Sequence, residues 1–198
     1  TDALDSAREL RSNWWDEWNI GDSTIGHRYG YTVGKYNLMS DLLTGLAKNP
    51  FGRRHILNLY QYTDLNETKG LYPCAYETLW SARKVNNEIY LDVTLVQRSS
   101  DYLVANYINK TQYVALMLMV CSHLGYKAGI FGHFVQNLHI YDRHFDAVNE
   151  LLSKKPLEIQ PIIKLKEDKT FFEFTVDDFI IQNTENIEKI KNKLELAI

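Results

Sequence analysis

Residues 85–96 read VNNEIYLDVTLV, and this stretch indicates the fold more clearly than any other. From Ile89 to Leu95, apolar residues alternate with polar or amphipathic ones, the period of a strand that buries one face. Residues 85–88, with Asn86 and Asn87 at their centre, form a tight connection, so the segment 76–83 is expected to be the antiparallel partner strand. A β-hairpin is therefore predicted near the middle of the chain.

Two helices are predicted on either side of this hairpin. Residues 113–124 are nearly all apolar and too long for an ordinary strand, which indicates a helix that is buried on every side and ends at Gly125. Residues 35–48 carry apolar side chains at helical spacing, and Asn49 and Pro50 stop the pattern. The first of these helices is expected at the centre of the core.

The shorter segments complete an α+β pattern. The same criteria predict strands at 56–62, 129–141, 159–165 and 171–174, a helix at 144–152 and a polar loop at 64–70. Strands and helices follow each other without a regular βαβ alternation, and there are no internal repeats. We therefore expect a single domain over residues 1–198, with a mixed sheet packed against a long buried helix.

Composition excludes several classes of protein. A chain of 198 residues that is 45% hydrophobic and 24% charged can bury a full core. Its net charge of −3 argues against binding DNA through phosphate neutralisation, and no apolar run is long enough for a membrane helix. Cys74 and Cys121 are the only cysteines, and no Cys/His cluster has zinc spacing, so neither a disulfide framework nor a metal is expected. These features favour a cytoplasmic protein.

A thiol in an unusual place is the first candidate for chemistry. Cys74 follows Pro73, between a polar loop and a strand, where the backbone is constrained and a side chain can project into a cleft. The alternative is a small buried hydrophobic residue, which is the ordinary role of cysteine. Cys121, inside the apolar helix, is assigned only that ordinary role.

Two groups of polar residues are candidates for ligand binding. The segment 97–101, QRSSD, ends the alternating strand with a guanidinium, two hydroxyls and a carboxylate, a set that suits a phosphate monoester. An arginine close to a thiol also favours the thiolate. Arg53 and Arg54 add two cations, although such pairs are more often solvated surface charges. His139 and Tyr141 share one face of a strand, where they could hold a sugar or serve only the structure.

The order and spacing of these groups resemble the thymidylate synthase family. The resemblance runs from about Trp15 to the C-terminus and rests on WDEW at 15–18, GHRYG at 26–30, RRHI at 53–56, PC at 73–74, QRS at 97–99 with Asp101, Asn109, and HIY at 139–141. It implies the mixed α+β fold of that family and its homodimer. Family members also carry an N-terminal stretch with a phosphate-binding arginine loop and a glutamate, which this chain is expected to lack because it begins after both.

The resemblance also implies a reaction. The Cys74 thiolate, activated by Arg98, would add to C6 of dUMP, and C5 would then attack the one-carbon unit of 5,10-methylenetetrahydrofolate. Hydride transfer would release dTMP and dihydrofolate. Tyr29 would take part in proton removal from C5. Catalytic roles are thus implied for Cys74, Arg98, Tyr29 and Asn109, and no metal is required.

The same resemblance assigns ligand contacts. Substrate binding is implied for Arg53, Arg54, Gln97, Ser99, Asp101, Asn109, His139 and Tyr141. Arg53 and Arg54 would reach the phosphate from the second subunit, His139 and Tyr141 would hold the ribose, and Asn109 would read the base edge. Contacts with the folate are implied for Trp15, Trp18, Asp101 and the C-terminal carboxylate of Ile198.

Two other activities stay open at this point. An amide at position 109 can donate and accept, which suits uracil, whereas a carboxylate there would favour cytosine. A pyrimidine deoxynucleotide hydroxymethylase, which quenches the same adduct with water, is one alternative, because Gln136, Asn137 and Leu138 replace the usual Gly-Asp pair and Ala75 replaces a frequent histidine. The other is a catalytically incomplete relative that only binds nucleotides.

Overall fold

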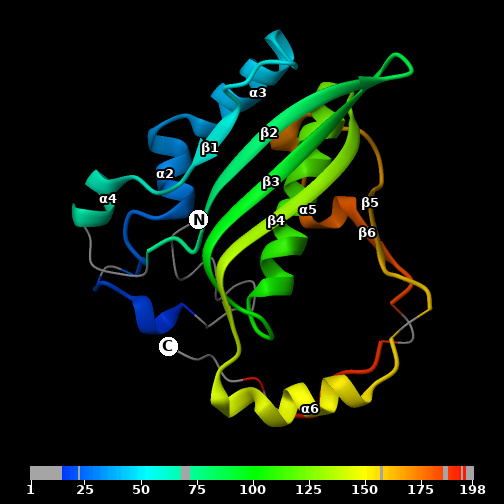
Figure 1. The fold of residues 1–198 in the computed structure, drawn as a ribbon. Coiled ribbons are helices and arrows are strands. Elements are labelled where there is room, and N and C mark those ends of the chain that lie inside the picture. The colour runs from blue at the N-terminus through cyan, green and yellow to red at the C-terminus, as the bar shows by residue number, and fades with distance from the viewer. Residues whose placement is uncertain are drawn as a thin grey trace.

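The computed structural model describes residues 15–21, 23–67, 72–156, 158–184, 187–192 and 194. A four-stranded sheet in the order β1-β2-β3-β4 forms its centre (Figure 1), made of β1 (Ile56–Asn58), β2 (Ala75–Val85), β3 (Glu88–Asp101) and β4 (Lys127–His139). β2 pairs antiparallel with β1 and with β3, whereas β3 and β4 are parallel. The predicted mixed sheet is therefore confirmed.

The predicted hairpin is the pair β2 and β3. Asn86 and Asn87 connect the strands with φ angles of 47° and 66°, the left-handed conformations of a two-residue hairpin turn. Trp80 pairs with Val93, and the alternation along β3 buries Leu91, Val93 and Leu95 on one face, as expected. The strand runs beyond the apolar alternation to Asp101, because β4 pairs with it along that extension.

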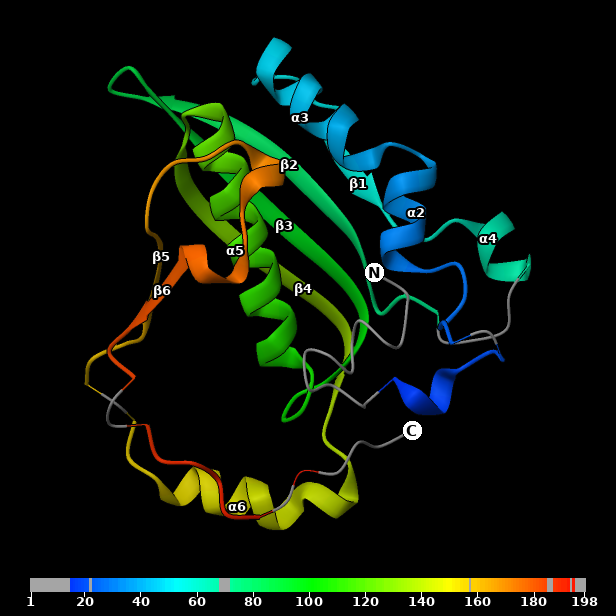
Figure 2. The same cartoon turned by 180° about the vertical axis from the view of Figure 1, so that it is seen from behind.

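A long helix links the two parallel strands. Helix α5 (Asn106–Leu124) lies along the sheet (Figure 2) and ends where Gly125 takes a φ of 67° and its N–H donates to the carbonyls of Cys121 and Ser122. No residue from 113 to 122 is exposed, but only Met117, Val120 and Cys121 are buried and His123 is exposed. The helix therefore packs in the core, whereas the prediction that it is buried on every side is wrong. Met117 and Val120 join the main apolar cluster with residues of the sheet and of the N-terminal helices. The helix begins earlier than its apolar run, at Asn106.

The N-terminal helices cover the β1 side of the sheet. They are α2 (Tyr29–Lys35), α3 (Leu38–Lys48) and α4 (Tyr62–Glu67), preceded by the 3-10 helix η1 (Asp16–Trp18). The predicted helix 35–48 starts at Leu38, because Asn37 has a φ of 52° and separates it from α2. The predicted strand 56–62 is shorter than expected. The predicted loop at 64–70 is wrong in part, since Asp64 is buried in α4 by an ion pair with Lys35 that the local sequence does not reveal.

The C-terminal part adds a helix and a two-stranded ribbon. After η2 (Asp142–His144), α6 (Phe145–Ser153) follows close to the predicted position, and β5 (Ile162–Leu165) pairs with β6 (Phe179–Gln182) across η3 (Phe171–Glu173) and η4 (Val176–Asp178). The strand predicted at 171–174 is wrong. Thr170 and Glu173 form a capping box there, which stabilises a helical turn, and the side chain of Phe171 is buried against the core.

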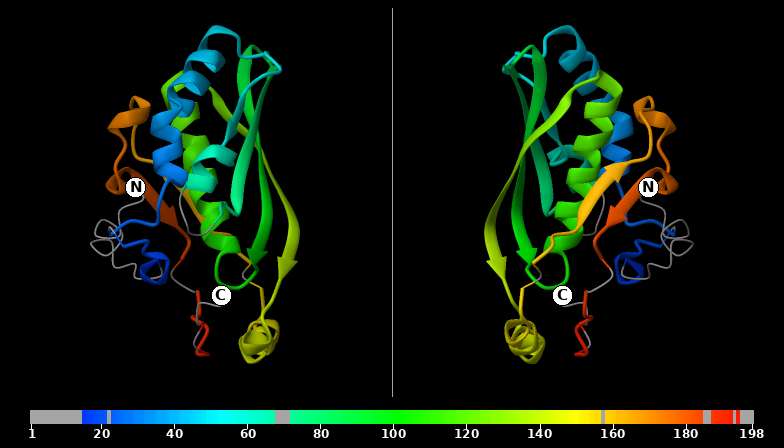
Figure 3. Two further views of the ribbon diagram at one scale, coloured as in Figure 1. Left: turned by 90° about the vertical axis from the view of Figure 1, so that its left-hand side faces the viewer. Right: turned by 90° about the vertical axis from the view of Figure 1, so that its right-hand side faces the viewer.

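The two faces of the sheet differ. Figure 3 shows α3 and α5 on one side of the strands, while no described helix covers the other side. That open face exposes large apolar side chains, namely Ile56, Leu79, Ile130, Phe134 and Leu138. We refer to these five residues as the open sheet face. None of the helices in the described ranges is both long and apolar enough to cross a membrane.

The turn of the hairpin is a test of the fold. Asn87→Val should lower the free energy of unfolding by about 1–2 kcal/mol, because a β-branched residue is strained at a positive φ. Asn87→Gly, which has no Cβ, should keep or raise stability. The difference in the free energy of unfolding is measured from urea unfolding midpoints, provided that the m-values of the two variants agree. Equal midpoints for the two variants would contradict the left-handed turn.

Candidate active site

The pairing of β2 with β3 brings Cys74 and Arg98 together. Cys74 immediately precedes β2, and its carbonyl accepts a hydrogen bond of 2.9 Å from the Arg98 backbone N–H. Arg98 Nη2 lies 3.5 Å from Cys74 Sγ and donates to the Tyr72 carbonyl at 2.8 Å, while Nε donates to the Pro73 carbonyl at 3.1 Å. Two backbone carbonyls thus hold the guanidinium beside the thiol.

Burial and charge act in opposite directions on this thiol. Burial raises the pKa of Cys74 above its ordinary value, and the Arg98 guanidinium lowers it by a smaller amount. Arg98 therefore acts in the expected direction, while desolvation acts in the other direction and more strongly. At neutral pH the resting group is a thiol with a cation held against it.

The hydroxyl of Tyr29 is hydrogen-bonded to the backbone of Cys74. Tyr29, the first residue of α2, accepts a hydrogen bond of 3.2 Å at Oη from the Cys74 N–H. Burial and the nearby Cys74 raise the pKa of Tyr29, so its hydroxyl stays protonated and can donate as well as accept. The structure thus brings Cys74, Arg98 and Tyr29 into one cluster, although they are far apart in the sequence.

A second group of polar side chains lies next to this cluster. The Gln97 amide is buried, and its Nε2 donates to Asn109 Oδ1 at 2.9 Å and to the Ser99 carbonyl at 3.0 Å. His133 Nε2 lies 2.9 Å from Gln97 Oε1. Sequence reasoning missed His133, although its position on β4 shares the parity of His139 and could have suggested it.

Residues at the far ends of β3 and β4 form a third group. Asp101 and His139 are register partners, and the rings of His139 and Tyr141 meet edge to face with centroids 5.0 Å apart. Asp101 Oδ1 accepts from the N–H groups of Leu103 and Val104 at 3.0 and 3.3 Å, and Oδ2 lies 3.7 Å from His144 Nδ1. The Asp101 carboxylate therefore also stabilises the turn that leads into α5.

Several candidates lie apart from Cys74. Arg53 and Arg54 are exposed on the loop before β1, where Ile56 pairs with Leu79, five residues after Cys74. At about 3.3 Å per residue this is ~17 Å along β2, so the two arginines do not reach Cys74 of their own chain. Ser99 and Arg98 are neighbours on β3 and therefore point to opposite faces.

The candidates for folate contacts are described only in part. Trp15 and Trp18 are half-buried in and beside η1, which lies at the same end of the sheet as the start of β2 in Figure 2. Ile198 lies outside the described residues. No group of three His, Cys, Asp or Glu side chains in the described ranges could hold a metal ion.

Comparison with known proteins identifies the family. The sequence model of thymidylate synthase matches residues 2–196. The chain belongs to the thymidylate synthase family. The thymidylate synthase of Lactococcus lactis subsp. cremoris (strain SK11) is 48% identical over 188 residues, which cover 93% of this chain and 67% of that protein. That of Streptococcus gordonii (strain Challis) is 43% identical over 189 residues, with 94% and 67% coverage.

A solved structure of the thymidylate synthase family agrees with the fold. The chain superimposes on the thermostable thymidylate synthase A from Bacillus subtilis with a TM-score of 0.84 and 29% sequence identity, covering 100% of this chain and 71% of that one. The family, the enzymatic character and the α+β class expected from the sequence are confirmed.

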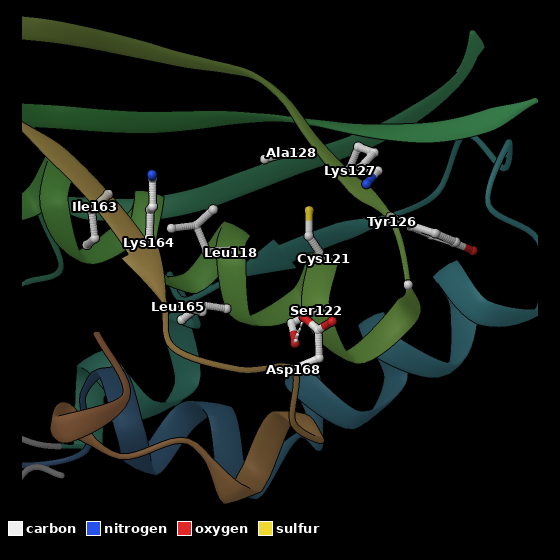
Figure 4. A pocket seen from close by; sticks show the side chains of 11 residues that line it. Leu118, Cys121, Ser122, Tyr126, Lys127, Ala128, Ile163, Lys164, Leu165 and Asp168 are labelled. Carbon is white, nitrogen blue, oxygen red and sulfur yellow. Dashed lines mark hydrogen bonds between the residues drawn. The ribbon is translucent and has the colours of Figure 1, made fainter. Parts of the chain in front are cut away.

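The cavity in Figure 4 is separate from the cluster of Cys74, Arg98 and Tyr29. It has a volume of about 450 Å³ and lies between the end of α5, the start of β4 and β5. Ala128, which lines it, pairs with Leu91, seven residues before Arg98, so the cavity is ~23 Å from Arg98 along β3. Cys121 also lines it, and burial raises the pKa of this thiol to about 12. The predicted structural role of Cys121 in the core is confirmed.

The electrostatic role of Arg98 can be tested directly. Arg98→Gln removes the positive charge beside Cys74, so the pKa of the thiol should rise and its alkylation by iodoacetamide at pH 8 should slow by about threefold or more. Arg98→Lys, which keeps a cation, should slow it less. Peptide-resolved mass spectrometry over a pH series measures the rate of Cys74 alkylation. If the midpoint of the pH–rate curve stays in place or moves to lower pH in Arg98→Gln, the electrostatic role of Arg98 is contradicted.

Proposed function

We propose that this protein makes dTMP by reductive methylation of dUMP with 5,10-methylenetetrahydrofolate, through a covalent adduct on Cys74. The observation that carries the proposal is the contact between Arg98 Nη2 and Cys74 Sγ beside the Tyr29 hydroxyl. A nucleophile needs activation by a lowered pKa or by a base, and the guanidinium is the cation in contact with this thiol. The similarity to proteins that are all named thymidylate synthases favours this reaction over the hydroxymethylase and over a binding protein without turnover.

Phosphate binding couples to thiol activation in this proposal. Arg98 is exposed, so its guanidinium can meet a 5′-phosphate while it stays close to Sγ. The Cys74 thiol gives its proton to solvent, the resulting thiolate forms the bond to C6, and the π electrons of the C5–C6 double bond move to C5 and O4 of the ring. Ser99 follows Arg98 on β3 with its side chain on the opposite face, so its assignment to the same phosphate rests on the family resemblance and not on the strand geometry.

Proton removal from C5 involves Tyr29 as a hydrogen-bonding group. Its raised pKa means that Tyr29 is not itself an anionic base at neutral pH. The hydroxyl can instead pass a proton onward or orient a water molecule next to C5. The hydrogen bond between the Tyr29 hydroxyl and the Cys74 N–H supports this role, because Cys74 is the residue that would carry the substrate.

The remaining ligand contacts follow the polar groups around Cys74. We assign Asn109 to the base edge and the pair of His139 and Tyr141 to the ribose hydroxyl, because their rings already meet at the end of the sheet. The reduced folate supplies the one-carbon unit and the hydride. The half-buried indoles of Trp15 and Trp18 offer flat apolar surfaces that fit its pterin ring, and we assign Asp101 and Ile198 to the same ligand.

We further propose that two copies of the chain pair through the open sheet face. Its five exposed apolar side chains would be covered by the same face of a second copy, which is the usual geometry of a twofold dimer. Arg53 and Arg54, too far from Cys74 of their own chain, would then reach the phosphate site of the partner. We expect the enzyme to work in the cytoplasm, in keeping with its two free thiols.

A covalent trap tests the reaction. Incubation with 5-fluoro-dUMP and methylenetetrahydrofolate should add both molecules to Cys74, because fluorine at C5 blocks proton loss. Intact mass and peptide mapping detect the adduct. Cys74→Ala should form none and lose turnover while it keeps affinity for dUMP, and Cys121→Ala, the control for the second thiol, should behave as wild type. Turnover of dUMP by Cys74→Ala would refute the mechanism.

Mixed dimers test the shared site. Cys74→Ala and the double variant Arg53→Gln/Arg54→Gln should each have little activity alone. In a mixed dimer, one site combines the intact thiol of one chain with the intact arginines of the other, so random mixing should restore about a quarter of wild-type activity. No recovery on mixing, with subunit exchange shown by native mass spectrometry, would mean that the arginines serve their own chain or none.

A further inference from the structure

The buried side chain of Gln97 lies in a chain of hydrogen bonds that has a direction. A carboxamide can turn by half a rotation and exchange its oxygen with its NH₂ group, so its shape alone does not set its polarity. A backbone carbonyl, however, can only accept. Gln97 Nε2 lies 3.0 Å from the Ser99 carbonyl, so the NH₂ group must face that carbonyl. The Gln97 oxygen therefore faces the other way.

The orientation of the Gln97 amide fixes the donor and acceptor roles of its two hydrogen-bond partners, His133 and Asn109. Its oxygen lies 2.9 Å from His133 Nε2, so that ring nitrogen must carry the proton and donate. Its NH₂ group also lies 2.9 Å from Asn109 Oδ1, so the Asn109 oxygen must accept and the Asn109 NH₂ group points away. That NH₂ group lies 3.4 Å from Gln112 Oε1, on the exposed side. A flipped Asn109 would set its NH₂ group against the NH₂ group of Gln97. Gln97 is only 1% exposed, so water could not relieve this clash of donors.

The edges of uracil and cytosine differ in the same sense. Uracil offers an accepting O4 and a donating N3–H, whereas cytosine offers a donating N4–H₂ and an accepting N3. An Asn109 amide in the observed orientation can donate to O4 and accept from N3–H with the second lone pair of its oxygen. Cytosine would require the flipped amide. A fixed polarity of Asn109 thus discriminates between the two bases.

We propose that His133 is a positioning residue for base selection: its ring N–H, through Gln97, holds the Asn109 amide in the orientation that accepts uracil and rejects cytosine. This inference rests on the proposed function, in which Asn109 reads the base. His133 lies on β4 as the register partner of Leu95, beside the buried Gln97, and it does not touch the substrate in this scheme.

The surroundings of His133 keep it in the required form. Burial and the ammonium of Lys110 both lower the pKa of His133, so the ring is neutral at physiological pH and bears a single N–H. The accepting Gln97 oxygen directs that hydrogen to Nε2. Loss of the donor leaves a buried carbonyl oxygen without its partner, which weakens the hold on the Gln97 amide and hence on Asn109.

Selectivity measured as binding tests the inference. The ratio of the dissociation constants of dCMP and dUMP, from calorimetry at pH 7.5, should fall by about tenfold in His133→Phe, which cannot donate. His133→Gln, which keeps an N–H donor, should hold the ratio within about twofold of wild type. Thermal unfolding is measured for each variant, and His133→Met, equally unable to donate, replaces His133→Phe if the latter does not fold.

A double-mutant cycle distinguishes this role from a general structural one. In an Asn109→Ala background, His133→Phe should no longer change the ratio, because the group through which it acts is gone. An unchanged ratio in His133→Phe, or an equal fall in the Asn109→Ala background, would overturn the inference while leaving dUMP binding and the Cys74 adduct intact. Failure of the wild-type protein to bind dUMP would instead refute the proposed function.

Discussion

The antiparallel pairing of β2 and β3 is the constraint on which the site depends. The hydrogen bond from the Arg98 N–H to the Cys74 carbonyl extends that pairing just past the strand, and it places the guanidinium against the thiol. A slip of one residue in the register would turn Arg98 to the opposite face and break this contact. The two asparagines of the turn and the buried leucines of β3 set that register, so the stability of the hairpin and the geometry of the nucleophile have one origin.

The environment of Cys74 is a balance between desolvation and charge. Burial favours the neutral thiol, and Arg98 favours the thiolate without reversing the balance. Such a resting state protects the thiol from oxidation and alkylation, which require the thiolate. It also couples reactivity to ligand binding, since any rearrangement of Arg98 on a phosphate changes the field at Sγ. The carbonyls of Tyr72 and Pro73, which hold the guanidinium in place, therefore belong to the electrostatics of the nucleophile.

The parallel pair β3 and β4 contributes a different kind of order. It places His133 beside Gln97, and through Gln97 it connects to Asn109 on the first turn of α5. The Ser99 carbonyl, which can only accept, and the His133 N–H together hold the polarity of these amides. The other face of the same sheet is apolar and exposed, so in the proposed function one sheet would serve both selection of the base and association of two subunits.

The hairpin, the central helix and the family could be predicted before the structure was known, because alternation, a long apolar run and ordered motifs are properties of the sequence. The sequence also named Cys74, Arg98, Tyr29 and Asn109 as candidates, and the structure brings the first three together. Tertiary structure alone decided the rest. Asp64 of α4 pairs with the distant Lys35, and Phe171 is buried against the core, and neither contact can be read from the local sequence. His133 lies beside Gln97 only because β4 pairs in parallel with β3. Burial raises the pKa of Cys74 although its arginine neighbour lowers it, because desolvation depends on everything packed around a group.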